Sequence, residues 1–232
     1  MKSHLVIIMC MALAASPVFA AEKSELKTQK DKVSYAIGLD IGTGLKKNEV
    51  DVDADILAKA IKDTLAGKKP LMTEEEVKTT MTEFQKDLQA KQQERTKAQS
   101  EKNKKEGEDF LAKNKSKEGV KTLPSGLQYK VITEGKGKTP KATDTVTVQY
   151  RGTLIDGTEF DSSYKRGQPA TFPVGGVIKG WTEALQLMKE GSKWQLFIPS
   201  DLAYGPNGTQ GGPIGPNAVL IFEVELVSIK AQ

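Results

Sequence analysis

The chain has 232 residues, and its 34 Lys and Arg against 30 Asp and Glu give a formal net charge of only +4, a balance that argues against nucleic acid as a partner. The single His4 and the single Cys10 both lie near the amino terminus. Beyond them the chain has no histidine base, no thiol nucleophile and none of the soft metal ligands that these residues supply, so we expect no metal, no cofactor and no covalent catalysis.

Residues 1–20 have the pattern of a secretory signal. Lys2 supplies a positive charge, residues 5–15 form an apolar run too short to span a bilayer, and small residues stand before a predicted cleavage at Ala21. A membrane anchor is the alternative, but Ser16 ends the apolar run early. Because no later segment is apolar for long enough to cross a membrane, we expect an exported protein without a membrane span, periplasmic if its source is a Gram-negative bacterium.

The composition changes near Val120. Residues 21–120 hold 41 charged residues and only three aromatics, whereas residues 121–232 hold 22 charged residues, ten aromatics and 15 glycines. The first pattern is typical of solvated helices and the second of strands and turns around a core. We therefore expect a helical dimerisation domain with a long linker helix over residues 21–120 and a second domain over residues 121–232.

Two short helices are predicted after the signal. The first begins near Ser34 and has an unusually apolar surface, and the second begins at Asp53 or Asp55 and ends at Gly67. Together with the start of a third helix they are too small to bury a core. Their apolar faces therefore need a partner. A second copy of the chain, docked through residues 21–90, is the simplest one, and the alternative is that these faces fold back on the second domain.

The third predicted helix begins with a capping box at Thr73 and continues without proline to about Lys115. Residues 91–109 of this helix are polar all round, which is typical of a helix that bridges two domains through solvent. An RNA or membrane contact is the alternative. Acidic and basic residues alternate evenly along the segment, however, and this favours a solvated surface.

The second half alternates strands with turns and holds one amphipathic helix. Trp194 falls on a strand position whose alternation predicts a plain core residue. One helix against a five- or six-stranded antiparallel sheet is an α+β domain. The predicted strands are 127–132, 145–154, 158–161, 171–174, 193–198 and 218–229, the helix is 177–189, and a loop rich in Gly and Pro precedes the last strand.

Five separated motifs stand out in this half. They are Val148-Gln149-Tyr150-Arg151-Gly152, Asp156-Gly157-Thr158-Glu159-Phe160-Asp161-Ser162-Ser163, Val177-Ile178-Lys179-Gly180-Trp181, Leu202-Ala203-Tyr204-Gly205 and Ile221-Phe222-Glu223-Val224-Glu225-Leu226. These motifs resemble the FK506-binding-protein (FKBP) family of peptidyl-prolyl isomerases, in the family's order and near its spacing, and the resemblance covers about residues 121–230. The helical first half with its signal is similar in architecture to the macrophage-infectivity-potentiator subgroup.

The resemblance implies a half-barrel sheet wrapped around the helix, with an apolar pocket between them. Trp181 would form the pocket floor beneath a substrate proline ring. Ala170 departs from the family, which often has an aromatic residue there. The implied walls are Tyr150, Phe160, Phe172 and Phe222, with Val177 and Ile178 at the edge and Ile214 packed over the ligand.

Three polar groups at the pocket also follow from the resemblance. The Tyr204 hydroxyl and the Ile178 backbone N–H would donate to substrate carbonyls. Asp161 would be the carboxylate at the pocket, and Arg166 matches a basic residue that pairs with it. Taken one at a time, each aromatic is more simply a core residue, and only their joint occurrence in family order favours a pocket.

The resemblance implies an enzyme that accelerates cis–trans isomerisation of X-Pro bonds in unfolded or folding exported polypeptides. A dimer would add chaperone-like capture, and FK506-like macrolides would be inhibitors. Two other functions stay open. The pocket could be a proline-segment binding module or chaperone with little turnover, or the chain could be a stalk-forming surface protein, for which the long capped helix is the only support.

Overall fold

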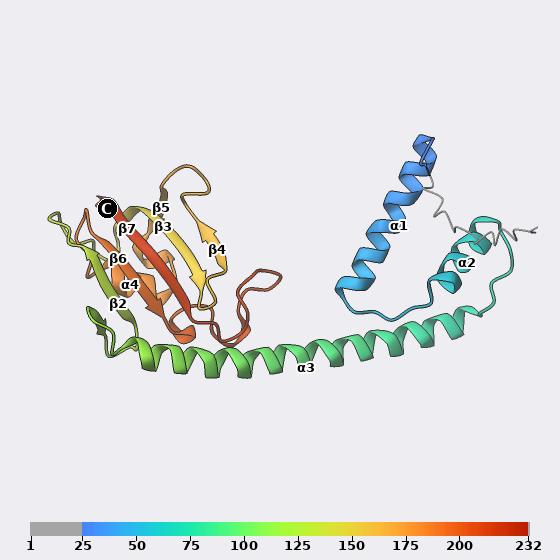
Figure 1. Ribbon diagram of the computed structural model, residues 1–232, viewed down its shortest axis with the longest axis horizontal. Helices are drawn as coiled ribbons and strands as arrows, with labels where there is room; N and C mark the ends of the chain where they lie inside the picture. Colours follow the sequence, from blue (N-terminus) through green and yellow to red (C-terminus); the bar gives the residue numbers. More distant parts are fainter. Residues whose placement is uncertain (1–24, 232) are drawn as a thin grey trace, which may run out of the picture. The chain divides into compact units, whose positions relative to one another are not determined.

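The computed structural model describes residues 25–231 (Figure 1). Their contacts divide the chain into two compact units, separated between Thr73 and Glu74. The predicted signal at residues 1–20, with His4 and Cys10, lies outside the described residues. None of the helices between residues 25 and 231 is both long and apolar enough to span a bilayer.

Helix α1 (Gln29–Lys47) starts earlier than Ser34, where the sequence predicted its beginning. Its N-cap is Thr28, whose hydroxyl accepts a hydrogen bond from the Asp31 N–H at 3.1 Å, while the Asp31 carboxylate accepts from the Thr28 N–H at 2.8 Å. This capping box satisfies the free donors of the first turn, so the helix begins there. Ser34 lies inside the helix and its hydroxyl donates to the Lys30 carbonyl instead.

Helix α2 (Ala54–Leu65) confirms Asp53 as its cap, since the Asp53 carboxylate accepts from the N–H groups of Asp55 and Ile56 at 2.9 and 3.0 Å. Gly67, which follows the helix, has φ of +65°. A left-handed backbone conformation directly after a helix favours glycine. The conformation of Gly67 therefore explains why the helix ends where the sequence predicted.

No residue between 25 and 73 is buried. The exposed side chains include large apolar ones that the sequence pattern had assigned to contact faces. On α2 they follow the helical period and lie on one side, whereas on α1 Val33, Ile37 and Ile41 lie on one side and Tyr35 and Leu39 on the opposite side. The exposed large apolar residues of the two helices are Val33, Tyr35, Ile37, Leu39, Ile41, Ile56, Leu57, Ile61 and Leu65.

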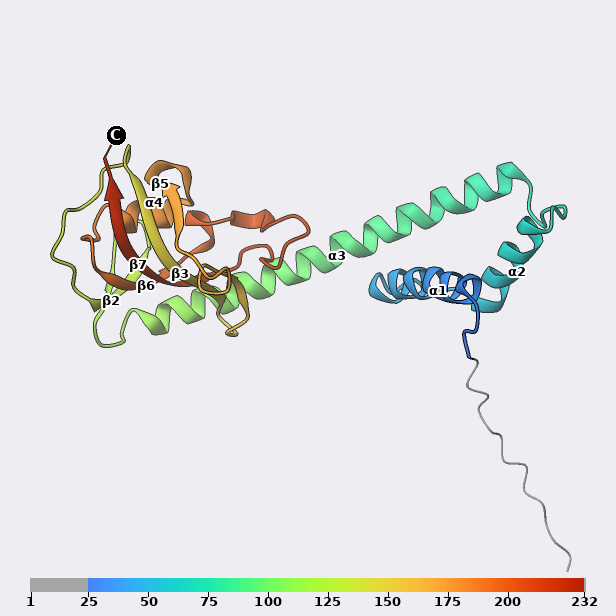
Figure 2. The same cartoon turned by 90° about the horizontal axis from the view of Figure 1, so that it is seen from above.

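Helix α3 (Glu74–Asn114) has 41 residues, and the predicted limits of Thr73 and about Lys115 agree with it. It belongs to the same compact unit as the sheet that follows. Figures 1 and 2 both show its carboxyl-terminal half, in green, running alongside that sheet. The long helix therefore has an exposed amino-terminal part and a part that is built into the second unit.

The prediction of a solvated surface over residues 91–109 is wrong at Gly107, which is buried. Beyond that stretch Asn114 is also buried, and the Phe110 ring lies 6.0 Å from the ring of Phe197 on the sheet. Few of the residues in the last turns of α3 are apolar, so the sequence pattern predicts a solvent-exposed helix there. Their contact with the sheet depends instead on one aromatic residue, on amide side chains and on the small size of glycine.

Within the described residues the second unit contains a seven-stranded antiparallel sheet in the order β1-β2-β6-β7-β3-β4, with β5 paired to β3. The prediction of five or six strands missed β1, a three-residue strand too short to show alternation. The strands are β1 (Val120–Thr122), β2 (Gln128–Thr133), β3 (Thr145–Leu154), β4 (Glu159–Ser162), β5 (Ala170–Pro173), β6 (Lys193–Ile198) and β7 (Leu220–Lys230).

Helix α4 (Lys179–Leu185) covers one face of this curved sheet and is shorter than the predicted helix over residues 177–189. Val177 and Ile178 are extended, with ψ of 177° and 149°. Both are β-branched residues, which favour extended backbone. The core lies between α4 and the sheet and includes Val146, Val148, Leu185, Leu196, Val224 and Leu226.

Trp194 is confirmed as a core residue. It is 6 % exposed, and its ring stacks on that of Tyr129 at 4.4 Å and 7°. The neighbouring Phe197 is also buried, although the alternation of β6 placed it on the other face. Phe110 of α3 covers it there, so the sheet is packed on both faces at this point.

Candidate active site

A hollow of about 640 Å³ opens between the sheet and α4. It is the place where strands β3, β4, β5 and β7 present their side chains to the start of α4. A loop over residues 208–219, called the pocket loop below, closes one side between the short 3-10 helix η3 (Gly205–Asn207) and β7. The lining residues are Tyr150, Phe160, Asp161, Phe172, Gly176, Val177, Ile178, Trp181, Tyr204, Thr209, Gly212, Pro213, Ile214 and Phe222.

Trp181 is the centre of an aromatic cluster in this hollow. Its ring meets those of Tyr150 and Phe222 at 5.2 Å and that of Phe172 at 6.0 Å, all close to perpendicular. Phe160 adds a further edge-to-face contact with Phe222 at 5.4 Å. Edge-to-face pairs stabilise fixed ring orientations. The rings therefore form a rigid apolar wall around an open space.

Gly152 makes room for two of these rings. In the sheet it lies opposite both Asp161 of β4 and Phe222 of β7. A Cβ atom at this position would lie 2.6 Å from the Phe160 ring and 2.7 Å from the Phe222 ring, far closer than side chains approach one another. The glycine in the Tyr-Arg-Gly motif thus has a packing role that its sequence context alone did not disclose.

Three N–H or O–H groups on lining residues have no partner among the described residues. The buried Trp181 Nε1 has no acceptor, and no hydrogen bond is formed by the Ile178 backbone N–H, which precedes the first turn of α4. Tyr204 is 43 % exposed at the mouth of the hollow. A peptide bound in the hollow could accept from the Ile178 N–H and from the Tyr204 hydroxyl, whereas the Trp181 Nε1 is buried within the wall.

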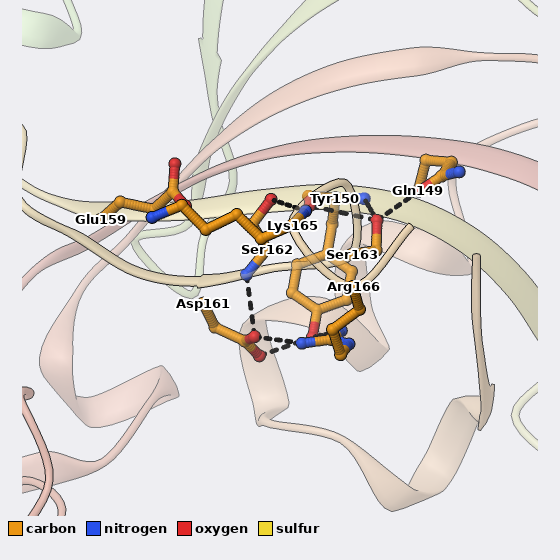
Figure 3. Close-up of polar contacts among 8 residues, drawn as sticks. All are labelled: Gln149, Tyr150, Glu159, Asp161, Ser162, Ser163, Lys165 and Arg166. Carbon is orange, nitrogen blue, oxygen red and sulfur yellow. Dashed lines mark hydrogen bonds and ion pairs between the residues drawn. The ribbon is translucent and has the colours of Figure 1, made fainter. Parts of the chain in front are cut away.

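The single carboxylate lining the hollow is fixed by three groups (Figure 3). The Tyr150 hydroxyl donates to Asp161 Oδ2 at 2.5 Å, the Ser162 N–H donates to Oδ1 at 2.8 Å, and the Arg166 guanidinium forms an ion pair with Oδ1. Arg166 also donates to the Tyr150 hydroxyl at 2.7 Å. The side chains thus form a closed triangle in which each polar group orients the other two.

This triangle shifts the pKa values of its members in opposite directions. Burial would raise the pKa of Asp161, but the hydrogen bonds from Tyr150 and Arg166 outweigh it and hold that pKa below its ordinary value. Burial, and then the hydrogen bond to Asp161, raises the pKa of Tyr150. Asp161 is therefore ionised and Tyr150 neutral at every pH near 7.

Ser163 holds Tyr150 from the backbone side. The Ser163 hydroxyl accepts from the Tyr150 N–H at 2.8 Å, and the Ser163 N–H donates to the Tyr150 carbonyl at 3.0 Å. Farther out, Glu159 forms ion pairs with Arg151 and Lys165. The segment Asp161-Ser162-Ser163, which spans the end of β4 and the residue after it, thus fixes the Tyr150 ring and the Asp161 carboxylate.

The structure brings all ten predicted site residues to the same hollow. Arg166 pairs with Asp161 as the resemblance implied, whereas Ala170 packs against the core outside the lining. The sequence did not single out four lining residues, Gly176, Thr209, Gly212 and Pro213. The only signal for the last three was the richness of their loop in Gly and Pro, and such a composition does not say which residues face inward.

Two family models match the chain. Residues 136–227 match the FKBP-type peptidyl-prolyl cis-trans isomerase, and residues 30–131 match the domain amino terminal to FKBP-type peptidyl-prolyl isomerase. The chain belongs to the FKBP-type peptidyl-prolyl isomerase family, and the protein is an enzyme of that type. Because both domains are present, it falls in the subgroup of that family whose members carry the names Mip and FkpA.

Relatives of this subgroup match along nearly the whole chain. The outer membrane protein MIP of Legionella longbeachae is 52% identical over 231 residues, covering 99% of both chains. The peptidyl-prolyl cis-trans isomerase Mip of Coxiella burnetii is 48% identical over 89% of this chain and 90% of its own length. Similarity over this length includes the helices as well as the isomerase domain.

Two solved structures agree with the fold. The crystal structure of FkpA from Escherichia coli superposes with a TM-score of 0.70 at 39% identity, covering 89% of this chain and 99% of that one. A peptidyl-prolyl cis-trans isomerase from Pseudomonas syringae pv. tomato gives a TM-score of 0.53 at 44% identity, over 57% of this chain and 96% of that one. The predicted class, helices followed by an antiparallel sheet around one short helix, is therefore confirmed.

Proposed function

We propose that the hollow around Trp181 is the catalytic site and that it binds the proline ring of a polypeptide substrate against the indole. The observation that carries the proposal is the aromatic cluster, in which Tyr150, Phe172 and Phe222 all turn an edge or face to Trp181. A saturated five-membered ring fits an apolar hollow of this kind because its burial removes apolar surface from water. Val177 and Ile214 line the same space.

The chemistry needs no nucleophile and no proton transfer. Resonance sets a barrier of about 18–20 kcal/mol to rotation about a peptide bond, and the X-Pro bond exchanges over tens of seconds or longer. In the transition state the amide is twisted and its carbonyl is less polar. A dry apolar site disfavours the planar, polar ground state more than the twisted state, and so lowers the barrier.

The unpartnered donors hold the chain on either side of the twisting bond. The Ile178 N–H and the Tyr204 hydroxyl lie on the lining and can each donate to a carbonyl of the substrate. Fixing the flanking carbonyls converts part of the substrate's binding energy into the bent geometry that rotation requires. Phe160 bounds the same hollow.

Asp161 contributes to the proposed site through its negative charge and through its hydrogen bond with Tyr150. The carboxylate stays ionised, and its hydrogen bond fixes the phenol of the wall. Loss of the carboxylate would therefore remove the acceptor of the Tyr150 hydroxyl, which would keep only its hydrogen bond from Arg166, and would leave that guanidinium without its anion.

Proline-peptide isomerisation by the full-length protein tests the site. We expect Trp181→Ala to lower kcat/KM about 100-fold, because the substrate proline loses the indole beneath it. We expect Asp161→Ala to lower kcat/KM about ten-fold, because the Tyr150 ring loses a hydrogen bond that orients it. Trp194→Ala is the matched control, since Trp194 is buried to the same degree but stacks on Tyr129 away from the hollow. A Trp181→Ala protein that folds and keeps wild-type kcat/KM would refute the proposed site.

A second function, a proline-segment binding module or chaperone with little turnover, is favoured by Ala170, which leaves one wall of the family pocket without an aromatic. The same assay separates the two. A wild-type protein that binds proline peptides but leaves their isomerisation at the uncatalysed rate would support the binding module.

We also propose that the protein is a homodimer through residues 21–90 and that the dimer adds chaperone-like capture of unfolded polypeptides. The support is the exposed apolar surface of α1 and α2, where Ile37 and Ile56 are more than half exposed. Exposed apolar patches are typical of protein interfaces. A second copy supplies the same apolar surface and so can cover it.

Export, and a periplasmic location if the source is Gram-negative, complete the proposal. The support is the signal pattern of residues 1–20 and the relative named as an outer membrane protein. FK506-like macrolides are proposed as inhibitors because their apolar ring would compete for the hollow. FK506 that leaves peptide isomerisation unchanged would contradict this last part.

A further inference from the structure

The pocket loop, residues 208–219, has two different sides. One side presents Thr209, Pro213 and Ile214 to the catalytic hollow. The other side faces α3, where Pro213 and Gly215 help to line a second hollow of about 400 Å³ together with Gln99 and Asn103 of the helix. Pro213 lines both hollows, so the loop is a thin wall between them.

Two side-chain hydrogen bonds tie this loop to α3. The Asn103 amide donates to the Pro216 carbonyl at 2.8 Å, and the Asn217 amide donates to the Ser100 hydroxyl at 2.7 Å. Ser100 and Asn103 are three residues apart, so they lie on one face of the helix. The partners are more than a hundred residues apart in sequence, and both bonds are specific to the folded chain.

Local interactions on the helix and in the loop orient the groups that form these two hydrogen bonds. Gln99 donates to Asn103 Oδ1 at 2.6 Å, which leaves the Asn103 amide nitrogen directed to Pro216. Asn217 has φ of +55°, a left-handed conformation that asparagine tolerates better than most residues. Nearby, a Cβ atom on Gly107 would lie 2.7 Å from Val219 Cγ2, so the helix and the end of the loop are in close contact.

The loop combines a flexible backbone with a few fixed points. It contains three glycines, at 211, 212 and 215, besides the Gly208 that starts it, and glycine loses more conformational freedom on ordering than any other residue. The Thr209 N–H donates to the Ile214 carbonyl at 2.8 Å, the Gly212 N–H to the Thr209 carbonyl at 3.1 Å and the Asn217 N–H to the Gly205 carbonyl at 3.0 Å. The Ile214 side chain is 6 % exposed and packs in the core. A rigid helix beside such a loop limits the positions that Ile214 can take.

We propose that Ser100 and Asn103 are positioning residues for the isomerase reaction, which hold the pocket loop so that Pro213 and Ile214 close over the bound proline. The proposal rests on the proposed function of the hollow around Trp181. It assigns the linker helix a part in substrate binding, although none of its residues lines the catalytic hollow. Releasing the two bonds lets the loop sample open positions that bind substrate poorly.

The kinetic consequence is specific to a positioning role. When only a fraction of the molecules is competent to bind, the apparent dissociation constant rises by the inverse of that fraction. Saturating substrate restores the closed loop, so kcat stays close to that of the wild type. We therefore expect the double variant Ser100→Ala/Asn103→Ala to raise KM for a proline tetrapeptide about three- to ten-fold, with kcat within about two-fold.

Three further variants of the full-length protein sharpen the test. Asn103→Asp keeps the shape but replaces the donor with an acceptor, so it is expected to raise KM as Asn103→Ala does. Ser100→Thr keeps the hydroxyl and is expected to retain the wild-type KM. Gln93→Ala, an exposed position on the same helix, is the matched control and is expected to change neither constant.

Amide hydrogen exchange supplies a readout besides activity. The Thr209 and Ile214 amides are expected to exchange faster in the double variant than in Gln93→Ala, while those of β3 and β7 keep their rates. Unchanged exchange in the loop, an unchanged KM, or a fall in kcat at constant KM would each overturn the proposal. If Trp181→Ala itself leaves the kinetics unchanged, the site has failed and this proposal with it; if Trp181→Ala inactivates while the double variant behaves as wild type, only the positioning role has failed.

Discussion

The helices of residues 25–73 and the isomerase domain use similar apolar residues in different ways. In the domain, β3, β7 and α4 bury Val148, Val224 and Leu185 completely. Between residues 25 and 73 nothing is buried, and Leu65 is 84 % exposed. A curved sheet can wrap around a helix and enclose a core within one chain, whereas two short helices have too little surface to do so. The comparison shows that residues 25–73 leave their apolar side chains exposed, whereas the isomerase domain encloses its own core.

Placing charges on the exposed apolar surface of α1 and α2 gives the largest expected effect. The double variant Ile37→Asp/Ile56→Asp places carboxylates where the proposed dimer buries apolar surface, so we expect complete loss of the dimer at micromolar concentration. Light scattering measures the mass, and turnover of a proline tetrapeptide is expected to stay within about two-fold of wild type because the site is complete in one chain.

The matched control is Lys69→Asp, an exposed polar position in the same region. A wild-type protein that scatters as a monomer at micromolar concentration would disprove the dimer. A double variant that remains dimeric would place the contact elsewhere.

Removing α3 tests whether the end of this helix is part of the isomerase domain. A fragment of residues 121–232 exposes Phe197 and strips Gln128 of its hydrogen bonds to Asn114 and to the Leu111 carbonyl. We expect its free energy of unfolding to be about 2–5 kcal/mol lower than that of residues 91–232. Urea unfolding of the two fragments measures the difference, and equal stabilities would show that the end of α3 is not part of the domain.

The smallest expected effect is that of pH on catalysis. The pKa of Asp161 is lowered and that of Tyr150 is raised, so neither group changes its charge between about pH 5 and pH 9. We expect kcat/KM to be flat over that range. The stability that ionised Asp161 contributes is present above its unfolded pKa and is lost as pH falls through its lower folded pKa, below about pH 4.

The stability of the helical region is expected to depend on pH in a similar way, so pH affects both regions of the comparison. Hydrogen bonds from the Thr28 backbone and hydroxyl lower the pKa of Asp31 in the capping box of α1. Acid is therefore expected to loosen the helix start and the pocket mouth over the same range. A bell-shaped profile of kcat/KM with a midpoint near neutrality would contradict the assignment of Asp161 and Tyr150.

Much of the local structure could be predicted because its causes are local. The alternation over β3, the cap at Asp53 and the unbroken run of α3 each depend on residues a few positions apart. The errors have long-range causes or lack a periodic signal: β1 is held by its pairing with β2, and the start of α1 moves to Thr28 because a capping box lies upstream of Ser34.

The sequence by itself determined the kind of chemistry, because it left no histidine or thiol in the described chain and placed Trp181, Asp161 and Tyr204 in motifs of one family. Tertiary structure alone decided how these residues are arranged. The room that Gly152 leaves for two rings, and the bonds from Ser100 and Asn103 to the pocket loop, join positions far apart in sequence. Such contacts depend on how a strand curves and where a loop turns, and neither is encoded in the spacing of neighbouring residues.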